Sequence, residues 1–568
     1  MLHFLSENSK KYNTFQKDFF YPLLPLSGIL KKIFLNGGYK EMVNWLKDAV
    51  FYEIYPQSFQ DSNGDGIGDI DGITSRLDYI KELGFNALWI NPCYDSPFKD
   101  AGYDVRNYKK VASRYGSNED LYRLFGEAHK RGIHVLLDLV PGHTSEEHPW
   151  FVESGRQERN AYSDRYVWAD YAWAMTGRPY IAGECERDGI YMLNFFKSQP
   201  ALNYGFGEID EDWQMPADCP AAIETREAMK DVMRFWMDRG CDGFRVDMAD
   251  SLVKNDTKDK AFTQKIWQDV RQMFDKNYPE CVLISEWDNP SQSIPGGFHS
   301  DFTLDNPGSG YRTLFRDYRD DPDNKGSNPA ILTKDHSFFR KDAGGNILRF
   351  LDKFLPHYEA VKGKGYISLI SGNHDTPRLR RTLDPDELKV AYGFLFTMPG
   401  VPFMYYGDEI GMRYIDNLPT KEGGYSRTGT RTPMQWDHSR NMGFSTAFPE
   451  DLYLPLDPSD DAPCVEEQLG KEDSLLETVR SLIALRHSQA DLQADGTFEP
   501  VYAKADCPLF LYRRGSLICG VNPSSSAITV KASEVKDGFG DQLLYSIGSA
   551  DISGDDLTLG AQSFVVLA

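Results

Sequence analysis

The sequence predicts an α/β fold: a (β/α)8 TIM barrel with a small inserted domain after the third strand and a C-terminal antiparallel β-sandwich. Three observations support this prediction. Apolar, strand-like segments alternate with helix-like segments eight times, three of the strands end in a carboxylate, and short alternating strands dominate only after about residue 490. Alternating strands and helices predict a parallel sheet, and eight such units predict that the sheet closes on itself.

The eight strand candidates are short apolar runs. They are Ala49–Tyr55, Asn86–Ile90, Ile133–Val140, Asp242–Asp247, Cys281–Glu286, Gly297–Thr303, Tyr366–Ser371 and Val401–Tyr405. Helices are expected between them, for example over Leu121–Arg131 and Glu224–Arg239. Apolar residues in the second of these recur with the spacing of one helix face, and a glycine directly follows each helix, where helices commonly end.

Two regions interrupt the repeat and define further domains. Residues 143–215 are rich in Trp, Tyr, Gly and Asp without periodicity, and a connection this long is expected to be functional. We assign the barrel to 45–142 and 216–490, and an inserted domain to 143–215. The β-sandwich is predicted over 491–568 from five short strands: Leu509–Tyr512, Leu517–Val521, Ala527–Val530, Leu543–Tyr545 and Ser563–Leu567.

Residues 1–44 match none of the later units. The segment that begins with Met42 would make a natural start, so we interpret 1–44 as an N-terminal extension, and N-terminal sequencing of the native protein would decide whether it is native. The segment lacks a basic start and its apolar stretches are interrupted by charges, which is a poor match to a secretory signal.

The composition indicates a folded protein that acts on a neutral molecule. Lys and Arg total 62 against 85 Asp and Glu, which gives a net charge of −23. This charge repels nucleic acid and anionic membranes, and no apolar run reaches the length of a membrane-spanning helix. The eight cysteines include no Cys-x-x-Cys pair, so we expect no zinc site and reduced thiols in a cytoplasmic protein. We expect a monomer or weak oligomer.

Three carboxylates follow predicted strands: Asp247, Glu286 and Asp375. At the C-terminal edge of a parallel sheet they suit acid–base and nucleophilic chemistry on a neutral substrate. Arg245 lies two residues before Asp247, hence on the same side of the strand, and we expect its guanidinium to keep Asp247 ionised. Glu286 follows an apolar run, so partial burial is expected to raise its pKa and keep it protonated. Alternative interpretations are a buried Arg–Asp pair and a helix-capping Glu.

The three strand ends, in this order, resemble the motifs of the α-amylase superfamily of retaining α-glucoside enzymes, glycoside hydrolase family thirteen. The segments are Gly243–Asp247, Leu283–Glu286 and Ser371–Asp375, and the resemblance covers roughly residues 45–568. It implies that Asp247 is the nucleophile, positioned by Arg245, and that Glu286 is the general acid and then the base. It further implies that Asp375 stabilises the transition state, while His374 donates a hydrogen bond to the sugar.

The third strand also resembles a family segment. By this resemblance His143 contacts the bound glucose and Asp138 supports the site. Gly142 stands where the family usually has an Asn that helps to bind calcium in many α-amylases, which leaves that calcium site unsupported.

Two further segments, Gly102–Asp104 and Gly429–Trp436, resemble the oligo-1,6-glucosidase branch, which includes α-glucosidases, dextran glucosidases and trehalose synthases. This resemblance implies that Tyr103 stacks on the terminal glucose. It also implies that Asp104 and Arg431 together hold its non-reducing hydroxyls and close the pocket, which selects chain ends. Ala201 and Met248 depart from the usual patterns, so the linkage preference stays open.

The loop after the first strand predicts a structural metal. Oxygen ligands recur at every second position, at Asp61, Asn63, Asp65, Ile67 and Asp69, which suits Ca²⁺ or Mg²⁺. The loop is not a complete EF-hand, because its twelfth position is Gly72 instead of Glu. The alternative is an Asp/Gly-rich turn without metal.

The leading function is a retaining glycoside hydrolase that cleaves α-glucosidic bonds from the non-reducing end of short oligosaccharides or disaccharides by double displacement. A transglycosylase or isomerase, such as a trehalose synthase or glucanotransferase, shares every catalytic residue named here, and an endo-acting α-amylase is a further alternative. A non-catalytic homologue associated with transporters is a remote alternative, because such a protein should have a membrane anchor and should have lost catalytic carboxylates.

Overall fold

The computed structural model describes residues 42–171, 173–175, 177–306, 308–318 and 335–568. Met42–Ala568 forms one compact unit. Most of the proposed N-terminal extension, residues 1–41, lies outside the described residues, and residues 42–44 lead into a 3₁₀ helix over Asn44–Asp48 with Val43 buried. No helix in the described ranges combines the length and apolar character needed to cross a membrane.

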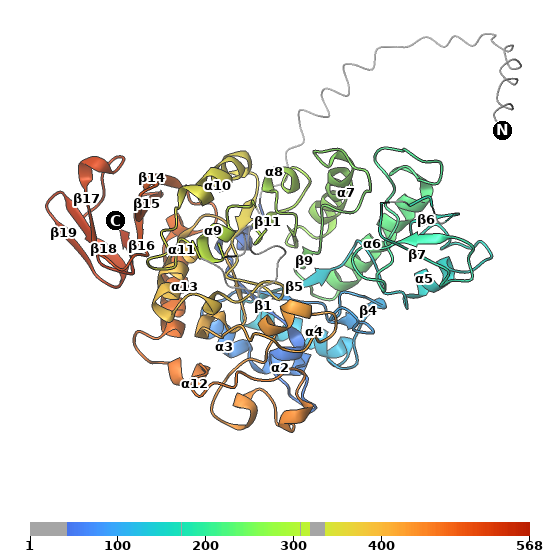
Figure 1. The fold of residues 1–568 in the computed structure, drawn as a ribbon, viewed down its shortest axis with the longest axis horizontal. Coiled ribbons are helices and arrows are strands. Elements are labelled where there is room, and N and C mark those ends of the chain that lie inside the picture. Colours follow the sequence, from blue (N-terminus) through green and yellow to red (C-terminus); the bar gives the residue numbers. More distant parts are fainter. Residues whose placement is uncertain (1–41, 172, 176, 307, 319–334) are drawn as a thin grey trace, which may run out of the picture. The chain divides into compact units, whose positions relative to one another are not determined.

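Eight parallel strands form the central sheet, which confirms the predicted barrel (Figure 1). In spatial order they are β12 (Tyr366–Ser368), β11 (Ser300–Phe302), β10 (Val282–Ser285), β9 (Gly243–Val246), β5 (His134–Leu139), β2 (Ala87–Ile90), β1 (Phe51–Ile54) and β13 (Phe403–Tyr405). A parallel bridge between Ile370 and Phe403 joins the two ends of this order, and the Phe403 N–H donates to the Leu369 carbonyl at 2.9 Å. The sheet is therefore closed.

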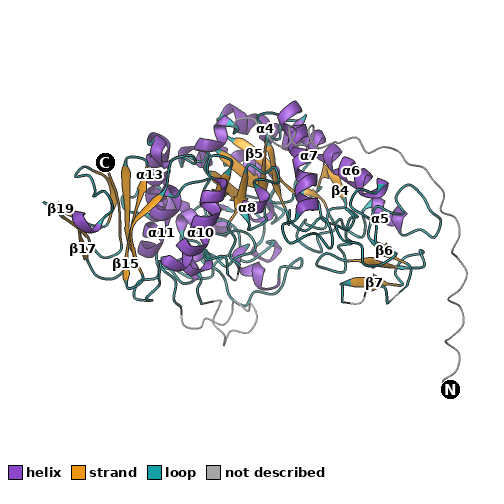
Figure 2. Cartoon of the chain, turned by 90° about the horizontal axis from the view of Figure 1, so that it is seen from above, coloured by secondary structure: helices purple, strands orange, loops and turns teal. Residues whose placement is uncertain are grey.

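Helices surround these strands, as Figure 2 shows. The longer ones are α4 (Asn118–Lys130), α6 (Pro220–Met237), α7 (Ala261–Asn277), α10 (Leu348–Val361), α11 (Pro385–Thr397) and α13 (Leu475–Ser488). The shorter ones are α2 (Ile70–Ser75), α3 (Leu77–Glu82), α5 (Pro149–Ser154), α8 (Pro290–Ser293), α9 (Arg312–Phe315) and α12 (Val465–Gln468). Ser117 and Asp384 begin α4 and α11 with capping boxes, and α6 buries Met229, Val232 and Trp236 in the main apolar core.

The strand register brings the predicted site residues to one edge. Arg245 of β9 lies opposite Asp138 of β5 on one side and Ile284 of β10 on the other. The N–H of Asp247 donates to Leu139 O at 2.9 Å, and the N–H of Glu286 donates to Val246 O at 3.0 Å. The carboxyl ends of these adjacent strands therefore lie together.

Residues 143–215 leave the barrel after β5 and form a separate layer. It contains α5 and a three-stranded sheet of β6 (Trp168–Ala169), β8 (Ile190–Met192) and β7 (Tyr180–Ala182), around a small apolar core. The Leu202 N–H donates to the Gly142 carbonyl at 3.1 Å, which ties the layer back to the end of β5. A two-stranded sheet of β3 (Tyr94–Asp95) and β4 (Asn107–Val111) adjoins it after β2.

The C-terminal region is antiparallel, as predicted. One sheet has the order β14 (Glu499–Lys504), β15 (Cys507–Arg514), β16 (Leu517–Asn522), β21 (Ser563–Leu567) and β18 (Leu543–Ile547). A second has β17 (Ile528–Lys531), β20 (Asp556–Leu559) and β19 (Ala550–Ser553). The sequence did not indicate β14, β19 and β20, because β14 contains a proline and the other two are short and half-polar. α11 packs on the first sheet, where the hydroxyls of Thr397 and Tyr512 lie 2.5 Å apart.

Candidate active site

A cavity of about 360 Å³ opens at the carboxyl ends of the barrel strands. Its volume lies in the range of small-molecule pockets. Strand ends, the inserted layer and the long connection after β13 all contribute to it. The lining residues are Asp100, Tyr103, His143, Phe195, Phe196, Asp247, Met248, Glu286, Asp375, Gly424, Tyr425, Ser426 and Arg427. The three sequence-predicted carboxylates therefore meet in one cavity.

Arg245 organises the floor of this cavity. Its buried guanidinium donates to Asp138 at 2.8 and 2.9 Å and to Asp247 at 3.2 Å, and it lies 2.6 Å from Glu286 Oε2. The contacts follow from the register, because β5 and β10 flank β9 on either side. A single guanidinium thus fixes the orientation of three carboxyl groups.

The electrostatics of Asp247 differ from the sequence prediction. Burial raises its pKa well above the ordinary value, the neighbouring charge of Glu286 raises it further, and Arg245 opposes both effects. Burial likewise raises the pKa of Asp138 to about 6. Arg245 does not hold Asp247 ionised by itself, because it is shared among three carboxylates and lies nearer to Glu286. One guanidinium shared among three buried carboxyl groups offsets only part of the effect of burial on the pKa of Asp247.

Asp375 has the opposite environment. Its carboxylate receives hydrogen bonds from Arg431 at 2.8 Å and from Arg427 at 3.0 Å, and His374 Nε2 lies 3.5 Å away. Burial alone would raise its pKa, but His374, Arg427 and Arg431 outweigh it and hold the pKa well below the ordinary range. Its side chain is 37% exposed, against 12% for Asp247 and Glu286. Asp375 is therefore an ionised acceptor that faces the cavity.

The prediction that Asp104 meets Arg431 across the pocket is wrong. Asp104 is fully buried in its own turn, where its carboxylate accepts hydrogen bonds from Ser96 Oγ and from the N–H groups of Lys99 and Asp100. Turn geometry directs this carboxylate to the backbone N–H groups that the tight loop leaves unpaired. Asp100, four residues earlier, lines the cavity instead.

Asp100 is held by two donors, Gln199 at 2.7 Å and Arg427 at 3.1 Å. Arg427 also donates to Asp375, so one guanidinium joins two cavity-lining carboxylates. Burial raises the pKa of Asp100, and the charges of Arg427 and Arg431 oppose that shift. The sequence analysis missed both Asp100 and Arg427. The only available signal was their place beside recognised segments, three residues before Tyr103 and four before Arg431.

Tyr103 and His143, which the resemblance assigns to the terminal glucose, both line the cavity. The Tyr103 hydroxyl donates to Asp138 at 2.9 Å, and its ring stacks on His374 with centroids 5.2 Å apart. His143 Nε2 lies 3.1 Å from the Tyr103 carbonyl, so this nitrogen carries the proton. Burial lowers the pKa of His143 to about 3, which keeps the ring neutral at ordinary pH.

His374 and Arg431, in contrast, stand behind the lining. His374 is 1% exposed, and its Nδ1 lies 3.0 Å from Glu53 and 3.1 Å from Asn91. Arg431 is also 1% exposed and donates to the His374 carbonyl at 2.8 Å. Neither residue lines the cavity, and both contact the cavity-lining Asp375.

The structure shows why position 142 is occupied by a glycine. A Cβ at this position would lie 2.7 Å from the Asn194 side-chain nitrogen. That amide hydrogen bonds to His143 Nδ1 at 3.0 Å. The inserted layer thus supplies a polar side chain that occupies the space next to Gly142 and orients His143.

Aromatic side chains form the cavity rim and were also missed. Phe195 and Tyr425 are 52% and 61% exposed, and Phe196 stacks on Tyr425 with centroids 6.0 Å apart. They come from the inserted layer and from the connection after β13. Adjacent phenylalanines in a polar segment were the only sequence signal. Exposed aromatic rings beside buried carboxylates suit a sugar, which presents apolar faces and hydroxyl edges.

The predicted metal loop folds around its own acidic side chains. Asp61 accepts the N–H groups of Asn63, Gly64 and Gly66, and Asp69 accepts that of Gly72 and begins α2. Asn63 and Asp65 are exposed. Three carboxylates, an amide oxygen and a backbone carbonyl are the donor types that a hard cation uses. Asp61 and Asp69 direct their oxygens to donors of the protein, including the hydroxyls of Ser445 and Ser62. In the described residues the three carboxylates of this loop do not gather within 4.8 Å of one another.

The comparisons with known proteins agree with this geometry. Residues 53–495 match the family model "Alpha amylase, catalytic domain". The trehalose synthase/amylase TreS of Mycolicibacterium smegmatis is 35% identical over 512 residues, covering 80% of this chain and 78% of that protein. The oligo-1,6-glucosidase of Heyndrickxia coagulans is 32% identical over 558 residues, covering 86% and 94%. A mutant isomaltulose synthase from Erwinia rhapontici, solved with D-glucose, superposes with a TM-score of 0.74 at 25% identity, covering 92% and 98%. The chain therefore belongs to the α-amylase family, glycoside hydrolase family thirteen.

Proposed function

We propose that this protein is a retaining exo-acting α-glucosidase that releases glucose from the non-reducing ends of short α-linked oligosaccharides or disaccharides. The observation that carries the proposal is the meeting of Asp247, Glu286 and Asp375 in one cavity, two of them joined through Arg245 and the third ionised. A nucleophile, a proton donor and a fixed anion are the groups that double displacement needs.

In the proposed first step, an Asp247 oxygen attacks the anomeric carbon of the terminal glucose, and Glu286 gives its proton to the departing glycosidic oxygen. The C–O bond to the leaving sugar breaks as the bond to Asp247 forms. In the second step Glu286, now a carboxylate, takes a proton from water while the water oxygen displaces Asp247. Asp375 accepts hydrogen bonds from the sugar hydroxyls. The two carboxyl groups of Asp247 and Glu286 are predicted to lie roughly 5–5.5 Å apart.

Exo action is supported by the charge network at the cavity wall. Arg427 connects Asp100 with Asp375, and Asp100 also receives a bond from Gln199 of the inserted layer. This network joins four segments that lie far apart in the sequence. Its charged groups could bind the hydroxyls of a terminal sugar and would obstruct a longer chain.

An isomerase or transglycosylase is the second candidate. It is favoured by the similarity to a trehalose synthase/amylase and by the fold shared with an isomaltulose synthase. The aromatic rim formed by Phe195, Phe196 and Tyr425 supports it as well, because such a rim can retain the leaving sugar while it turns. The two functions differ only in whether water or the retained sugar attacks the intermediate.

Product analysis separates these functions. The enzyme is incubated with maltose, isomaltose, trehalose, sucrose and starch, and the release of glucose is compared with the formation of isomeric disaccharides. Glucose as the main product supports the hydrolase, and a new disaccharide at constant total disaccharide supports the isomerase. Ready cleavage of an oligosaccharide blocked at its non-reducing end would refute exo action.

Variants test the assigned residues. Asp247→Asn should abolish turnover while the protein stays folded. Asp100→Asn should raise the KM for maltose. Asp104→Asn should lower the melting temperature and leave KM nearly unchanged, because Asp104 holds only its own turn. If the Asp104 variant loses sugar affinity and the Asp100 variant does not, the proposed pocket is wrong.

We also propose that the loop from Asp61 to Asp69 holds a structural Ca²⁺ or Mg²⁺, and that the protein is cytoplasmic and acts as a monomer or weak oligomer. The metal would tie the loop to the start of α2, through oxygens of the residues named above. Its role would be stability alone, since none of these residues lines the cavity.

A further inference from the structure

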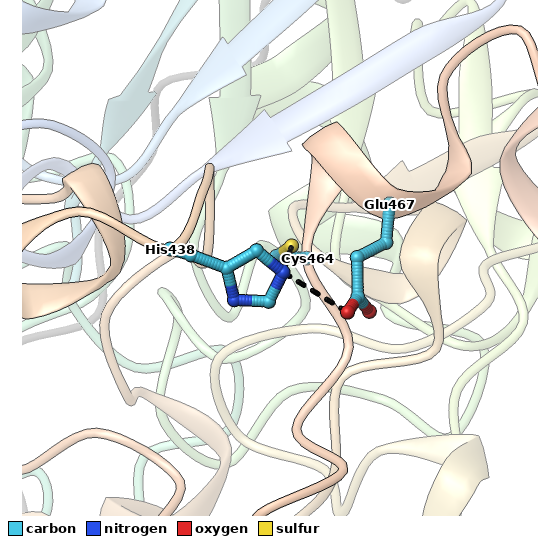
Figure 3. Close-up of side chains that lie close together, drawn as sticks. All are labelled: His438, Cys464 and Glu467. Atoms are coloured by element: carbon cyan, nitrogen blue, oxygen red, sulfur yellow. Dashed lines mark hydrogen bonds and ion pairs between the residues drawn. The ribbon is translucent and has the colours of Figure 1, made fainter.

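We propose that His438, Cys464 and Glu467 form a binding site for a borderline divalent metal of the Zn²⁺ class, separate from the catalytic cavity (Figure 3). In the described parts of the chain this is the only group of at least three His, Cys, Asp or Glu residues whose ligand atoms all lie within 4.8 Å of one another. The sequence predicted no zinc, because it contains no Cys-x-x-Cys pair. The fold assembles the site from two segments instead.

The spacing of the three atoms is close to that around a bound ion. Cys464 Sγ lies 3.8 Å from His438 Nε2, and His438 Nε2 lies 3.0 Å from Glu467 Oε1. With metal–ligand lengths of about 2.3 Å for sulfur and about 2.0 Å for nitrogen and oxygen, a tetrahedral ion would place these pairs roughly 3.5 and 3.3 Å apart. Side-chain shifts of a few tenths of an ångström would therefore admit the ion, and water could supply the fourth ligand.

Backbone hydrogen bonds hold the two segments together. The N–H of Val465 donates to the Gln435 carbonyl at 3.0 Å, and that of Glu466 donates to the Trp436 carbonyl at 2.9 Å. His438 lies two residues beyond this pairing, while Cys464 is the N-cap of α12 and Glu467 lies within the helix. The framework is fixed without a metal, so binding requires little ordering of the chain.

Exposure and ligand chemistry define the class of metal. The His438 and Glu467 side chains are 61% and 49% exposed, which leaves a path from solvent, whereas Cys464 is buried beneath them. A sulfur, an imidazole nitrogen and one carboxylate favour Zn²⁺, Co²⁺ or similar ions over the hard ions Ca²⁺ and Mg²⁺.

The location gives the site a structural role. The segment that carries His438 is continuous with Arg431, whose guanidinium holds Asp375 in the cavity. An ion shared by His438 and α12 would strengthen the attachment of this segment. Metal binding should therefore raise the melting temperature and change the catalytic constants much less.

The test uses the full chain without an affinity tag, freed of metal by a chelator and titrated with Co²⁺. A thiolate-to-cobalt charge-transfer band should appear at one equivalent, and Zn²⁺ should remove it by competition. Cys464→Ser should abolish the band, His438→Ala and Glu467→Gln should each weaken binding by roughly tenfold or more, and Cys507→Ser should match the wild type. His438→Ala keeps the thiol and alters an exposed residue, so it remains informative if Cys464→Ser does not fold. Absence of the band, or an equal band in Cys464→Ser and the wild type, would overturn the proposal.

Discussion

Replacing Arg427 with alanine tests the pocket assignment most directly. Its guanidinium donates to Asp375 at 3.0 Å and to Asp100 at 3.1 Å, and its side chain is 24% exposed. A hydrogen bond to a charged group contributes about 1.5–3 kcal/mol. Asp375 keeps its bond to Arg431 at 2.8 Å. We therefore count the loss of one charged hydrogen bond between the bound sugar and the Arg427–Asp100 pair. The expected fall in kcat/KM is then about 10- to 160-fold, from the relation of 1.36 kcal/mol per factor of ten.

The measurement is steady-state kinetics on maltose and on a chromogenic α-glucoside, with circular dichroism as a check of folding. KM should rise because Asp100 loses its partner, and kcat should fall if Asp375 is held less firmly in the transition state. Arg427→Lys should recover part of the activity, since one cation can still reach one carboxylate. Arg440→Ala removes an exposed arginine outside the lining and is the matched control. A change of less than twofold for Arg427→Ala would refute the argument that this network binds the sugar.

Three further predictions concern other parts of the molecule. His148 is buried and begins α5, and burial lowers its pKa to about 3, below the value of 6.5 expected on unfolding. The unfolded chain therefore binds more protons, and the free energy of unfolding falls as pH drops from 6.5 toward 3. Between pH 7 and pH 5 the wild type should lose about 2 kcal/mol of unfolding free energy through His148, and His148→Asn should not lose this amount. Urea titrations of both proteins at the two pH values measure the difference. Gly142→Ala should displace the Asn194 amide and break its hydrogen bond to His143. Loss of this one bond should raise KM roughly fivefold, and an unchanged KM would contradict this reasoning. Asp65→Asn should reduce the rise in melting temperature that Ca²⁺ gives to the chelator-treated wild type. Asp65 is exposed and accepts the Ile67 N–H, so the substitution should cost little stability apart from the metal. Equal rises in both proteins would mean that the loop is a turn without metal.

Sequence periodicity determined the barrel, because each buried strand must be apolar and each covering helix must have one apolar face. The strand ends, together with their resemblance to family motifs, identified Asp247, Glu286 and Asp375, and the carboxyl ends of parallel strands meet at one edge. Periodicity located the strands of the barrel within a few residues of those in the structure. These inferences about the barrel need only local patterns and the known geometry of a closed sheet.

The tertiary structure decided which charged groups act together. Asp100 and Asp104 are four residues apart, and sequence gave no means to tell that one enters the cavity while the other binds its own turn. Arg427 reaches Asp100 across 327 positions of sequence. Loop conformation sets such pairings, and it depends on contacts with distant segments instead of local propensity.

The same reason accounts for the electrostatics and for the proposed metal site. The sequence indicated that Arg245 lies beside Asp247, but only the fold shows that Asp138 and Glu286 share the same guanidinium. Burial, and then the charge of Glu286, raise the pKa of Asp247 against the expected direction. His438 and Cys464 are likewise separated along the chain and have no motif spacing. Sequence patterns determine which residues are buried and where strands end, whereas the number of charges that share one buried space is a property of the folded chain alone.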